Sequence, residues 1–512
     1  METKSRTEYS ARNTTVAVIS RFSAIFMGFI LRIVFTHTLS ESYVGVNGLF
    51  LDIVNILSLT EMGVGTAITY ALYRPIEEQD IEKQKSLMKL YCKFYRIVAV
   101  IVTIIGVAII PFMDYLIKDQ PDVDHLIFIY ILYLTNTVSS YLLIYKRTLL
   151  DAHQLSYIGT IYQTSSWIIQ DVIQMAILLF TRNFILYLLV NLLTTVICNV
   201  CISRRADRMY PYLKDKDVAP LSKSEQRDIF KNIKAMLMHK IGTVVVNNTD
   251  NLLISAFVGI VSVGMYSNYY LVIGSIKQVL EQVFQGITAS VGNLGVTSDE
   301  KRVKKVFEAS FFLCHWLYGF SAICLYELLN PFVELSFGAN YVFTRNIVLM
   351  LCMNFFITGM RNASLVFRDS LGLFWYDRYK SIIEAVLNLV ISIILVQHLG
   401  TAGVFLGTII STLLTSAWVE PYVLYKYRIK SSCLDYFWHY GIYCCVVAGS
   451  WYLTSRLCSL YHGGLIMTLI VRLLICCSVP NLIMLICYCQ TREFQFLWDK
   501  AVLVYQSKKK SR

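Results

Sequence analysis

The sequence predicts an all-α polytopic membrane protein with about fourteen transmembrane helices. Of the 512 residues, 56% are hydrophobic and only 16% are charged, whereas a soluble domain carries about 25% charged residues. Apolar stretches long enough to cross a bilayer recur from Val16 to Cys489. The polar linkers expected in a soluble chain of this length do not separate them.

Each predicted span is an apolar run of about 20 residues or more, bounded by charged or turn-forming residues. Two spans, 43–73 and 262–292, are long enough that we expect them to tilt or to extend beyond the bilayer. The predicted spans are 14–36, 43–73, 91–113, 124–145, 155–180, 184–203, 233–258, 262–292, 304–326, 341–360, 381–398, 402–425, 434–455 and 463–489.

The distribution of positive charge supports this span count independently. If the N-terminus lies inside and the spans alternate, 38 of the 46 Lys and Arg residues fall in cytoplasmic segments. Only four fall in outer segments, and four lie within spans. The positive-inside rule demands this bias, and one span too many or too few would invert it partway along. We therefore expect both termini in the cytoplasm.

The same distribution argues against a nucleic-acid partner, because the basic residues are scattered over eight short segments and form no single face. The 14 cysteines lie mostly within or beside spans and show neither a loop-based disulfide framework nor zinc-ligand spacing. The sequence also contains no nucleotide-binding glycine loop. We expect no catalytic residues, metal or cofactor, and we expect coupling to an ion gradient, H⁺ or Na⁺.

A weak internal repeat relates the two halves of the chain. Val44-Gly45 in YVGVNGLFLDI corresponds to Val263-Gly264 in SVGMYSNYYLV, at an offset of 219 residues. A second echo, YKRTLL from Tyr145 and VFRDSL from Val366, has an offset of 221 residues. Six predicted spans separate the copies, and an even number preserves orientation. This pattern predicts parallel repeats about an axis along the membrane normal, with a cargo cleft at the midplane.

The repeat predicts two six-helix lobes followed by two further helices. The expected order is an N-terminal lobe (1–203), a basic cytoplasmic linker (204–232), a C-terminal lobe (233–430), two additional transmembrane helices (431–489) and a basic cytoplasmic tail (490–512).

Four segments carry a resemblance to a known family. They are YVGVNGLFLDIVNILSLTEMGVGTAITYALYRPI from Tyr43, KLYCKFYRI from Lys89, NNTDNLLISAFVGIVSVGMYSNYYLV from Asn247 and HLGTAGVFLGTIIS from His398. In these segments the chain resembles the polysaccharide-transport branch of the multidrug, oligosaccharidyl-lipid and polysaccharide exporter superfamily. The resemblance implies MATE-like lobes and a flippase for polyprenyl-pyrophosphate-linked oligosaccharides, acting by alternating access in a bacterial cytoplasmic membrane.

Such a flippase serves O-antigen, capsule or exopolysaccharide synthesis. The resemblance further implies a lipid-linked oligosaccharide substrate, contact with membrane lipids, a polysaccharide polymerase as partner and a monomeric state. The alternatives are a cation-coupled multidrug exporter or a lipid II flippase of the same superfamily. A membrane polysaccharide polymerase is disfavoured because the longest predicted outer loop, 327–340, contains Glu327 and Glu334 but no arginine or histidine.

A flippase for a pyrophosphate-bearing lipid needs a wet, cationic cavity, because dragging a diphosphate through hydrocarbon is prohibitive. Arginine suits this task, since its planar fork binds phosphate oxygens bidentately. Arg21 and Arg32 are the leading candidates, because 11 residues are about three helical turns and place both on one face. The alternative is that each side chain snorkels to the nearer membrane surface.

Lys277 is the third candidate for binding pyrophosphate, and Glu281 follows it by four residues, so the two can pair. The pair can be a structural bridge or a coupling site. Asp52, Glu61 and Asp250 are the remaining intramembrane acids proposed for coupling or for a polar cavity. Asp52 and Glu61 do not share a helical face, and Asp250 can equally make a polar helix–helix contact.

Other charges near the inner ends of spans are given no transport role. Snorkelling explains Glu420, which lies beside Pro421 near a span end. Inner-loop positions with gating contacts are expected for Arg361, Arg368, Asp369, Asp377 and Arg378.

Overall fold

The computed structural model describes residues 6–58, 64–118, 121–215, 218–297, 299–461 and 463–510, and the regular elements in these ranges are helices. Contacts between Cα atoms divide the chain into two compact units, Met1–Gly264 (unit 1) and Met265–Arg512 (unit 2). The predicted fold class, an all-α polytopic membrane protein, is confirmed. The lobe boundaries at 203 and 233 stay a prediction.

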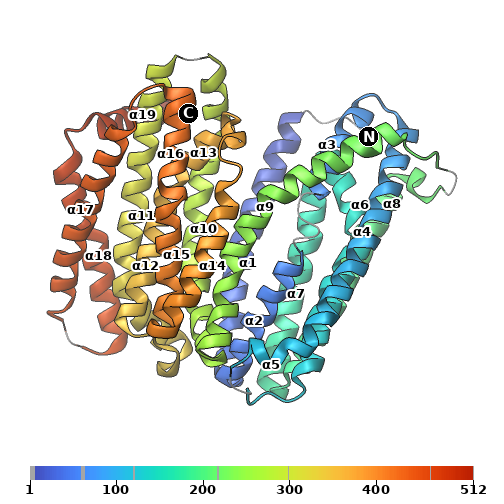
Figure 1. Cartoon of the computed structure of the whole chain (residues 1–512), viewed down its shortest axis with the longest axis horizontal. Helices are drawn as coiled ribbons and strands as arrows, with labels where there is room; N and C mark the ends of the chain where they lie inside the picture. The colour runs from blue at the N-terminus through green and yellow to red at the C-terminus, as the bar shows by residue number, and fades with distance from the viewer. Residues whose placement is uncertain are drawn as a thin grey trace. The chain divides into compact units, whose positions relative to one another are not determined.

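Unit 1 consists of long helices that pack as neighbours, α1 on α7, α4 on α6 and α6 on α8 (Figure 1). Its elements are α1 (Arg6–Thr38), α2 (Glu41–Leu57), α3 (Val64–Glu77), α4 (Ile81–Ile109), η2 (Ile110–Phe112), α5 (Met113–Leu116), α6 (Leu126–Ala152), α7 (Ser156–Thr181), α8 (Phe184–Met209), η3 (Pro211–Lys214) and α9 (Lys223–Phe257). Helix α10 (Ile260–Thr297) begins in unit 1 and ends in unit 2.

Two helices of unit 1 begin well before the predicted spans because polar side chains cap them. The Asp80 carboxylate accepts a hydrogen bond from the Lys83 amide, 2.9 Å away, at the start of α4. Ser222 and Glu225 form a capping box at the start of α9. Such caps satisfy amide groups that the first helical turn leaves unpaired. A hydropathy pattern alone misses these polar first turns.

The second predicted span, 43–73, consists of two helices, α2 and α3. Residues 59–63 between them lie outside the described ranges, and Glu61 is one of them.

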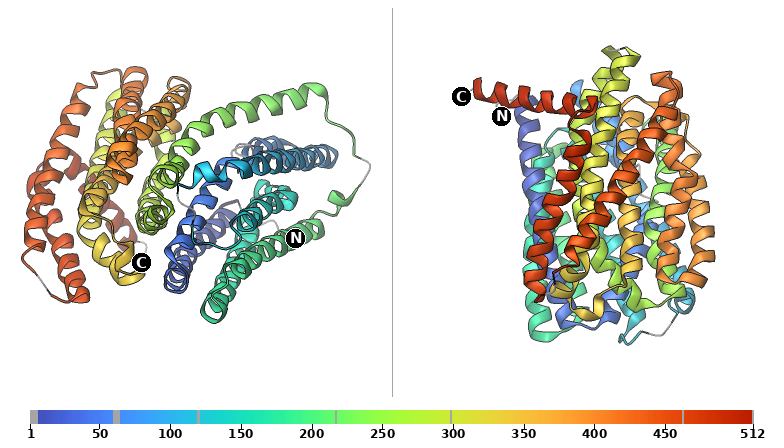
Figure 2. Two further views of the ribbon diagram at one scale, coloured as in Figure 1. Left: turned by 60° about the horizontal axis from the view of Figure 1, so that its bottom comes forward. Right: turned by 90° about the vertical axis from the view of Figure 1, so that its left-hand side faces the viewer.

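Unit 2 also consists of long helices that lie side by side, with α11 next to α12 and α18, and α17 next to α18 (Figures 1 and 2). Its elements are α11 (Glu300–Phe337), η4 (Ala339–Tyr341), α12 (Arg345–Met360), α13 (Asn362–Ser370), η5 (Leu373–Trp375), α14 (Lys380–Leu399), α15 (Thr401–Leu414), α16 (Ser416–Leu424), the π-helical turn η6 (Tyr425–Ile429), α17 (Leu434–Cys458), α18 (Leu465–Tyr488) and α19 (Arg492–Lys510).

The predicted outer loop at 327–340 is wrong, because α11 continues to Phe337. Glu327 ended the apolar run in the sequence, yet its side chain is buried within unit 2. The Ser455 hydroxyl of α17 donates to its carboxylate, and a guanidinium nitrogen of Arg472 in α18 lies 4.0 Å from the other carboxylate oxygen. These partners make a buried charge tolerable inside the helix.

Ten helices in the described ranges are long and apolar enough to cross a membrane. They coincide with ten of the predicted spans. The other four predicted spans are not among these ten. Span 43–73 corresponds to α2 and α3, 233–258 to α9, 262–292 to α10 and 434–455 to α17. The first is divided between two helices, and the other three carry polar and aromatic residues that lower their hydropathy. The total of fourteen spans therefore stays a prediction.

Candidate functional site

Arg21 and Arg32 both lie on α1, which is continuous from Arg6 to Thr38. The helical geometry thus places them on one face, about three turns apart. Arg21 is exposed and Arg32 is partly buried within unit 1. Whether either side chain faces a transport cavity stays a prediction.

Aromatic residues surround Arg32. Its guanidinium carbon lies 5.8 Å from the ring centroid of Phe35, within the range of a cation–π interaction. Phe35 in turn packs edge-on against Tyr187 of α8, with 5.4 Å between ring centroids. Phe35 also packs edge-on against Phe184 of α8, with 5.5 Å between ring centroids. Arg32 therefore lies beside a group of aromatic rings contributed by α1 and α8.

Asp52 makes a polar contact between helices α2 and α9. The Asn251 side-chain amide donates a hydrogen bond of 2.6 Å to the Asp52 carboxylate. Asp250, the next residue on α9, is buried. Asn251 therefore makes a polar contact between helices of the kind expected for this segment. A coupling role for Asp52 or Asp250 stays a prediction.

Lys277 and Glu281 form the expected pair on α10, since the ammonium nitrogen lies 3.9 Å from a carboxylate oxygen. Both side chains are 39% exposed within unit 2. A pair this exposed retains contact with its surroundings, so it can still exchange partners. Its use as a phosphate or coupling site stays a prediction.

Sequence reasoning missed an ionic network in unit 2, which we call the α13–α16 network. Its cations are Arg361, Arg368 and Lys380, and its anions are Asp377, Glu384 and Glu420. The assignment of Glu420 to the membrane surface is wrong, because its side chain is completely buried. Arg368 also pairs with the more exposed Asp369, 2.7 Å away, so each cation has an anionic partner, which lowers the cost of removing the buried charges from water.

Arg361 is central to the α13–α16 network. It donates to both carboxylate oxygens of Glu420, over 3.2 Å from Nε and 2.8 Å from Nη2. Its Nη1 donates to Glu384 over 3.3 Å. Lys380 also donates to Glu420. The guanidinium fork thereby joins α14 and α16 at the break between α12 and α13.

Hydroxyl groups complete the surroundings of Glu384. Thr412 of α15 donates to one carboxylate oxygen over 3.0 Å, and Ser416 of α16 donates to the other. Both oxygens of the buried Glu384 carboxylate therefore accept hydrogen bonds from helices packed against α14.

Helical spacing in the sequence would have been enough to predict part of this network. Lys380 and Glu384 are four residues apart, so they share a face. Nothing in the local pattern places Arg361 or Glu420 beside them. Among the described residues, no group of three or more His, Cys, Asp and Glu side chains is arranged to hold a metal ion.

The comparisons with solved structures agree with this helical architecture. A lipid II flippase MurJ in an inward closed conformation superposes with a TM-score of 0.64 at 11% identity, covering 93% of this chain and 98% of that protein. An inward-facing multidrug resistance MATE family transporter of the MOP superfamily gives 0.54 at 15% identity, over 78% and 96%. The Vibrio cholerae MATE transporter VcmN in its bent form gives 0.50 at 12% identity, over 84% and 98%.

At these identities the structural matches establish the fold alone, which is that of the multidrug, oligosaccharidyl-lipid and polysaccharide exporter superfamily. The sequence establishes the family: residues 10–287, more than half of the chain, match the polysaccharide biosynthesis protein family, and the chain belongs to it. It is therefore a multi-pass membrane transporter of the polysaccharide-transport branch. No curated protein sequence matches it significantly.

Proposed function

We propose that the protein is a flippase that moves polyprenyl-pyrophosphate-linked oligosaccharide units across the bacterial cytoplasmic membrane for surface polysaccharide synthesis. The observation that supports this cargo is that each unit carries a basic residue within a predicted span, Arg32 in unit 1 and Lys277 in unit 2. Intramembrane charges are costly and mark transport pathways by default.

The chemistry of the cargo explains these basic residues. The pyrophosphate is anionic, so its passage requires cations that replace water. Beside Arg32, Phe35 is buried, so the partly buried Tyr187 ring is the one that offers a surface on which a sugar ring can stack. Alternating access would then move the bound head group between the membrane faces while the polyprenyl tail stays in lipid.

The acidic residues supply the proposed coupling. Asp52, Asp250 and Glu281 lie on helices α2, α9 and α10, and any of them can take up a proton or a sodium ion. We further propose cytoplasmic termini, a monomeric state and a polysaccharide polymerase as partner, on the strength of the charge bias and of family analogy.

Transport of a fluorescent polyprenyl-pyrophosphate oligosaccharide into proteoliposomes tests the proposal. The variants are Arg32→Ala and Lys277→Ala, and the matched control is Arg456→Ala, which removes a basic residue at the predicted outer end of α17. We expect the wild type and the control to flip the substrate, and both test variants to lose at least about tenfold in rate, equivalent to about 1.4 kcal/mol.

The alternatives give different results in the same vesicles. Wild-type protein that moves no lipid-linked sugar but expels organic cations would be a multidrug exporter. Wild-type protein that moves lipid II but not longer oligosaccharides would be a lipid II flippase. If wild type flips the oligosaccharide and the test variants match it, the cargo stands and the assignment of Arg32 and Lys277 fails.

A further inference from the structure

Helix α19 at the C-terminal end leaves the bundle of unit 2. It follows α18 after a short turn, and Figure 2 (right) shows it running across the ends of the long helices and not alongside them. The segment 490–512 contains six Lys and Arg residues against two acidic residues, a net charge of +4. This excess of positive charge favours an anionic partner in addition to the bundle.

The contacts of α19 with α11 fix which face points into the membrane. In the predicted topology α11 begins on the inner side, so Trp316 lies about 16 Å deeper than Lys305. Phe494 stacks on Trp316, with 5.8 Å between ring centroids. Phe496, in contrast, lies beneath the Lys305 ammonium, which is 5.1 Å from its ring centroid. The Phe494 face of α19 is therefore the membrane side.

Each face of α19 continues with a residue four positions on. On the membrane side, Trp498 stacks nearly parallel on Phe494, with 6.1 Å between ring centroids, yet it is 61% exposed. On the other side, Lys500 lies 5.9 Å from the Phe496 ring centroid and is exposed. An exposed indole facing the membrane and an exposed ammonium facing away match the two layers of a membrane interface.

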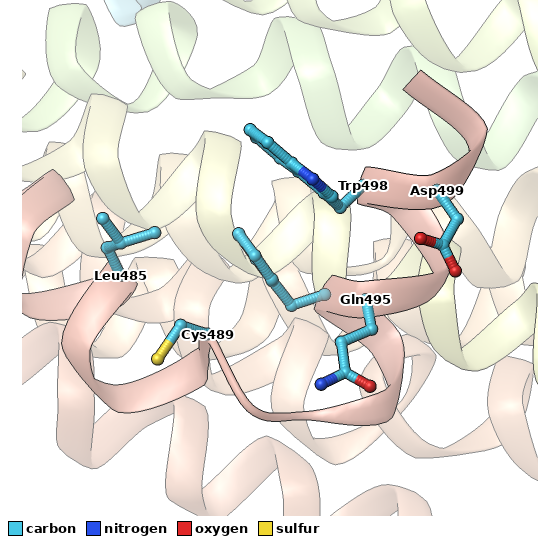
Figure 3. A pocket seen from close by; sticks show the side chains of 6 residues that line it. Leu485, Cys489, Gln495, Trp498 and Asp499 are labelled. Carbon is cyan, nitrogen blue, oxygen red and sulfur yellow. The ribbon is translucent and has the colours of Figure 1, made fainter. Parts of the chain in front are cut away.

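A pocket lies in the angle between α18 and α19. It has a volume of about 360 Å³ and is lined by Leu485, Cys489, Phe494, Gln495, Trp498 and Asp499. Figure 3 shows Leu485 of α18 and Trp498 of α19 on different sides of it, with Cys489 at the end of α18. Leu485 and the neighbouring Ile486 are both exposed, so the pocket continues the lipid-facing side of α18. Its volume and the apolar side chains of Leu485, Phe494 and Trp498 suit part of an acyl chain, whereas Gln495 and Asp499 add polar groups to its lining.

We propose that α19 is an interfacial helix that docks on anionic phospholipids of the inner leaflet, with an acyl chain in this pocket and the phosphate groups near Arg492 and Lys500. The proposal rests on cytoplasmic placement of the C-terminus but not on the identity of the cargo. Asp499 opposes binding of an anion, but the basic residues of the segment outnumber the acidic ones threefold.

Hydrogen exchange of the α19 amides in the full-length protein tests this docking. One set of nanodiscs contains phosphatidylcholine alone, and the other also contains phosphatidylglycerol. We expect exchange to be about 25-fold slower with phosphatidylglycerol, since Arg492 and Lys500 near an anionic surface each contribute about fivefold in affinity. Lys500→Gln should reduce the lipid dependence by about that factor, and Trp498→Ala should speed exchange in both lipids.

Trp375→Ala is the matched control, because Trp375 lies outside α19 and is 62% exposed, nearly the same as Trp498. It should leave α19 exchange unchanged, and the amides of α11 and α18 report in every sample whether the bundle is intact. Equal α19 exchange in the two lipids, or a Trp498→Ala variant that exchanges like wild type, would overturn the proposal. Hydrogen exchange does not depend on transport, so it tests the docking of α19 even if the protein does not flip the proposed cargo.

Discussion

Gly45 and Gly264 lie against each other in unit 1: a Cβ atom added to Gly264 would come 3.0 Å from the amide nitrogen of Gly45. These glycines occupy equivalent positions in the two copies of the internal repeat. A Cβ on Gly45 would also collide with the carbonyl oxygen of Ile260, immediately before the repeat. The Val-Gly echo therefore marks a close approach of backbones, which small residues permit within membranes.

This approach predicts that Gly45→Ala destabilises the protein by about 1–3 kcal/mol, because the obstacle is a backbone carbonyl that cannot rotate away. Gly28→Ala is the matched control: it is also helical, and an added Cβ would meet nothing within 4 Å. The control should be neutral or slightly stabilising, as alanine favours helix over glycine. Thermal unfolding in detergent compares them, and equal shifts would refute the contact.

The hydrogen bond from Asn251 makes it possible to separate a structural role of Asp52 from a coupling role. Asn251→Ala removes a hydrogen bond of 2.6 Å to this carboxylate and should cost about 1 kcal/mol, as polar contacts between membrane helices do. Asp52→Asn keeps the shape of the side chain and an acceptor oxygen, so we expect a smaller loss of stability. If Asp52 couples transport, Asp52→Asn should nevertheless stop ion-driven flipping, whereas unchanged flipping would leave it a structural residue.

A pH effect is predicted for Glu225, which lies in the first turn of α9 in the predicted cytoplasmic linker. The Lys83 ammonium, 2.7 Å away, and then Ser222 lower the pKa of Glu225 from its ordinary 4.5 to about 2. A lowered pKa contributes stability above pH 4.5, and this contribution is lost as the pH falls through 2. Because both side chains are 40% exposed, the effect should be below about 1 kcal/mol.

Lys83→Met tests this prediction through unfolding curves recorded from pH 5 to pH 3 in a non-ionic detergent. The wild type should lose more stability over this range than the variant. Between pH 5 and pH 3, Glu225 takes up a proton in the unfolded state but stays ionised in the folded wild type. Parallel pH dependence in the two proteins would contradict the bridge.

Much of the fold could be predicted because the membrane constrains it. Apolar runs and the positive-inside bias do not depend on which helices meet, so they located helices such as α7 and α14 from the sequence alone. The length of α11 could not be predicted in this way. Glu327 looks like the end of a span until Ser455 and Arg472, 128 and 145 residues further along, are placed beside it.

The candidate site was predictable only where partners are near in the sequence. The spacing of Lys277 and Glu281 was enough to predict their pairing, as 3.9 Å confirms. The partners of the buried Glu420 are Arg361 between α12 and α13, Arg368 of α13 and Lys380 of α14, and Arg361 lies 59 residues away in the chain. Its local sequence is compatible with a surface position, so the prediction that it snorkels failed for want of tertiary information.

The α13–α16 network yields the last prediction, a double-mutant cycle on Arg361 and Glu420. Arg361→Met leaves buried carboxylates short of a counter-charge and should cost about 3 kcal/mol or more. Glu420→Gln frees Arg361 from its bidentate partner. If the pair interacts as its 2.8 and 3.2 Å bonds indicate, the double variant should be more stable than the sum of the single effects implies, by about 1–3 kcal/mol.

The matched control is the pair Arg74 and Glu78, which has a similar bond of 2.7 Å but side chains that are 85% and 52% exposed. Its coupling free energy should be much smaller than that of the buried pair, because water and salt screen an exposed pair. Chemical unfolding of the four proteins in each cycle gives both values. Equal coupling free energies in the two cycles would mean that burial does not strengthen the Arg361–Glu420 interaction, and the network would then not be what holds α14 and α16 together.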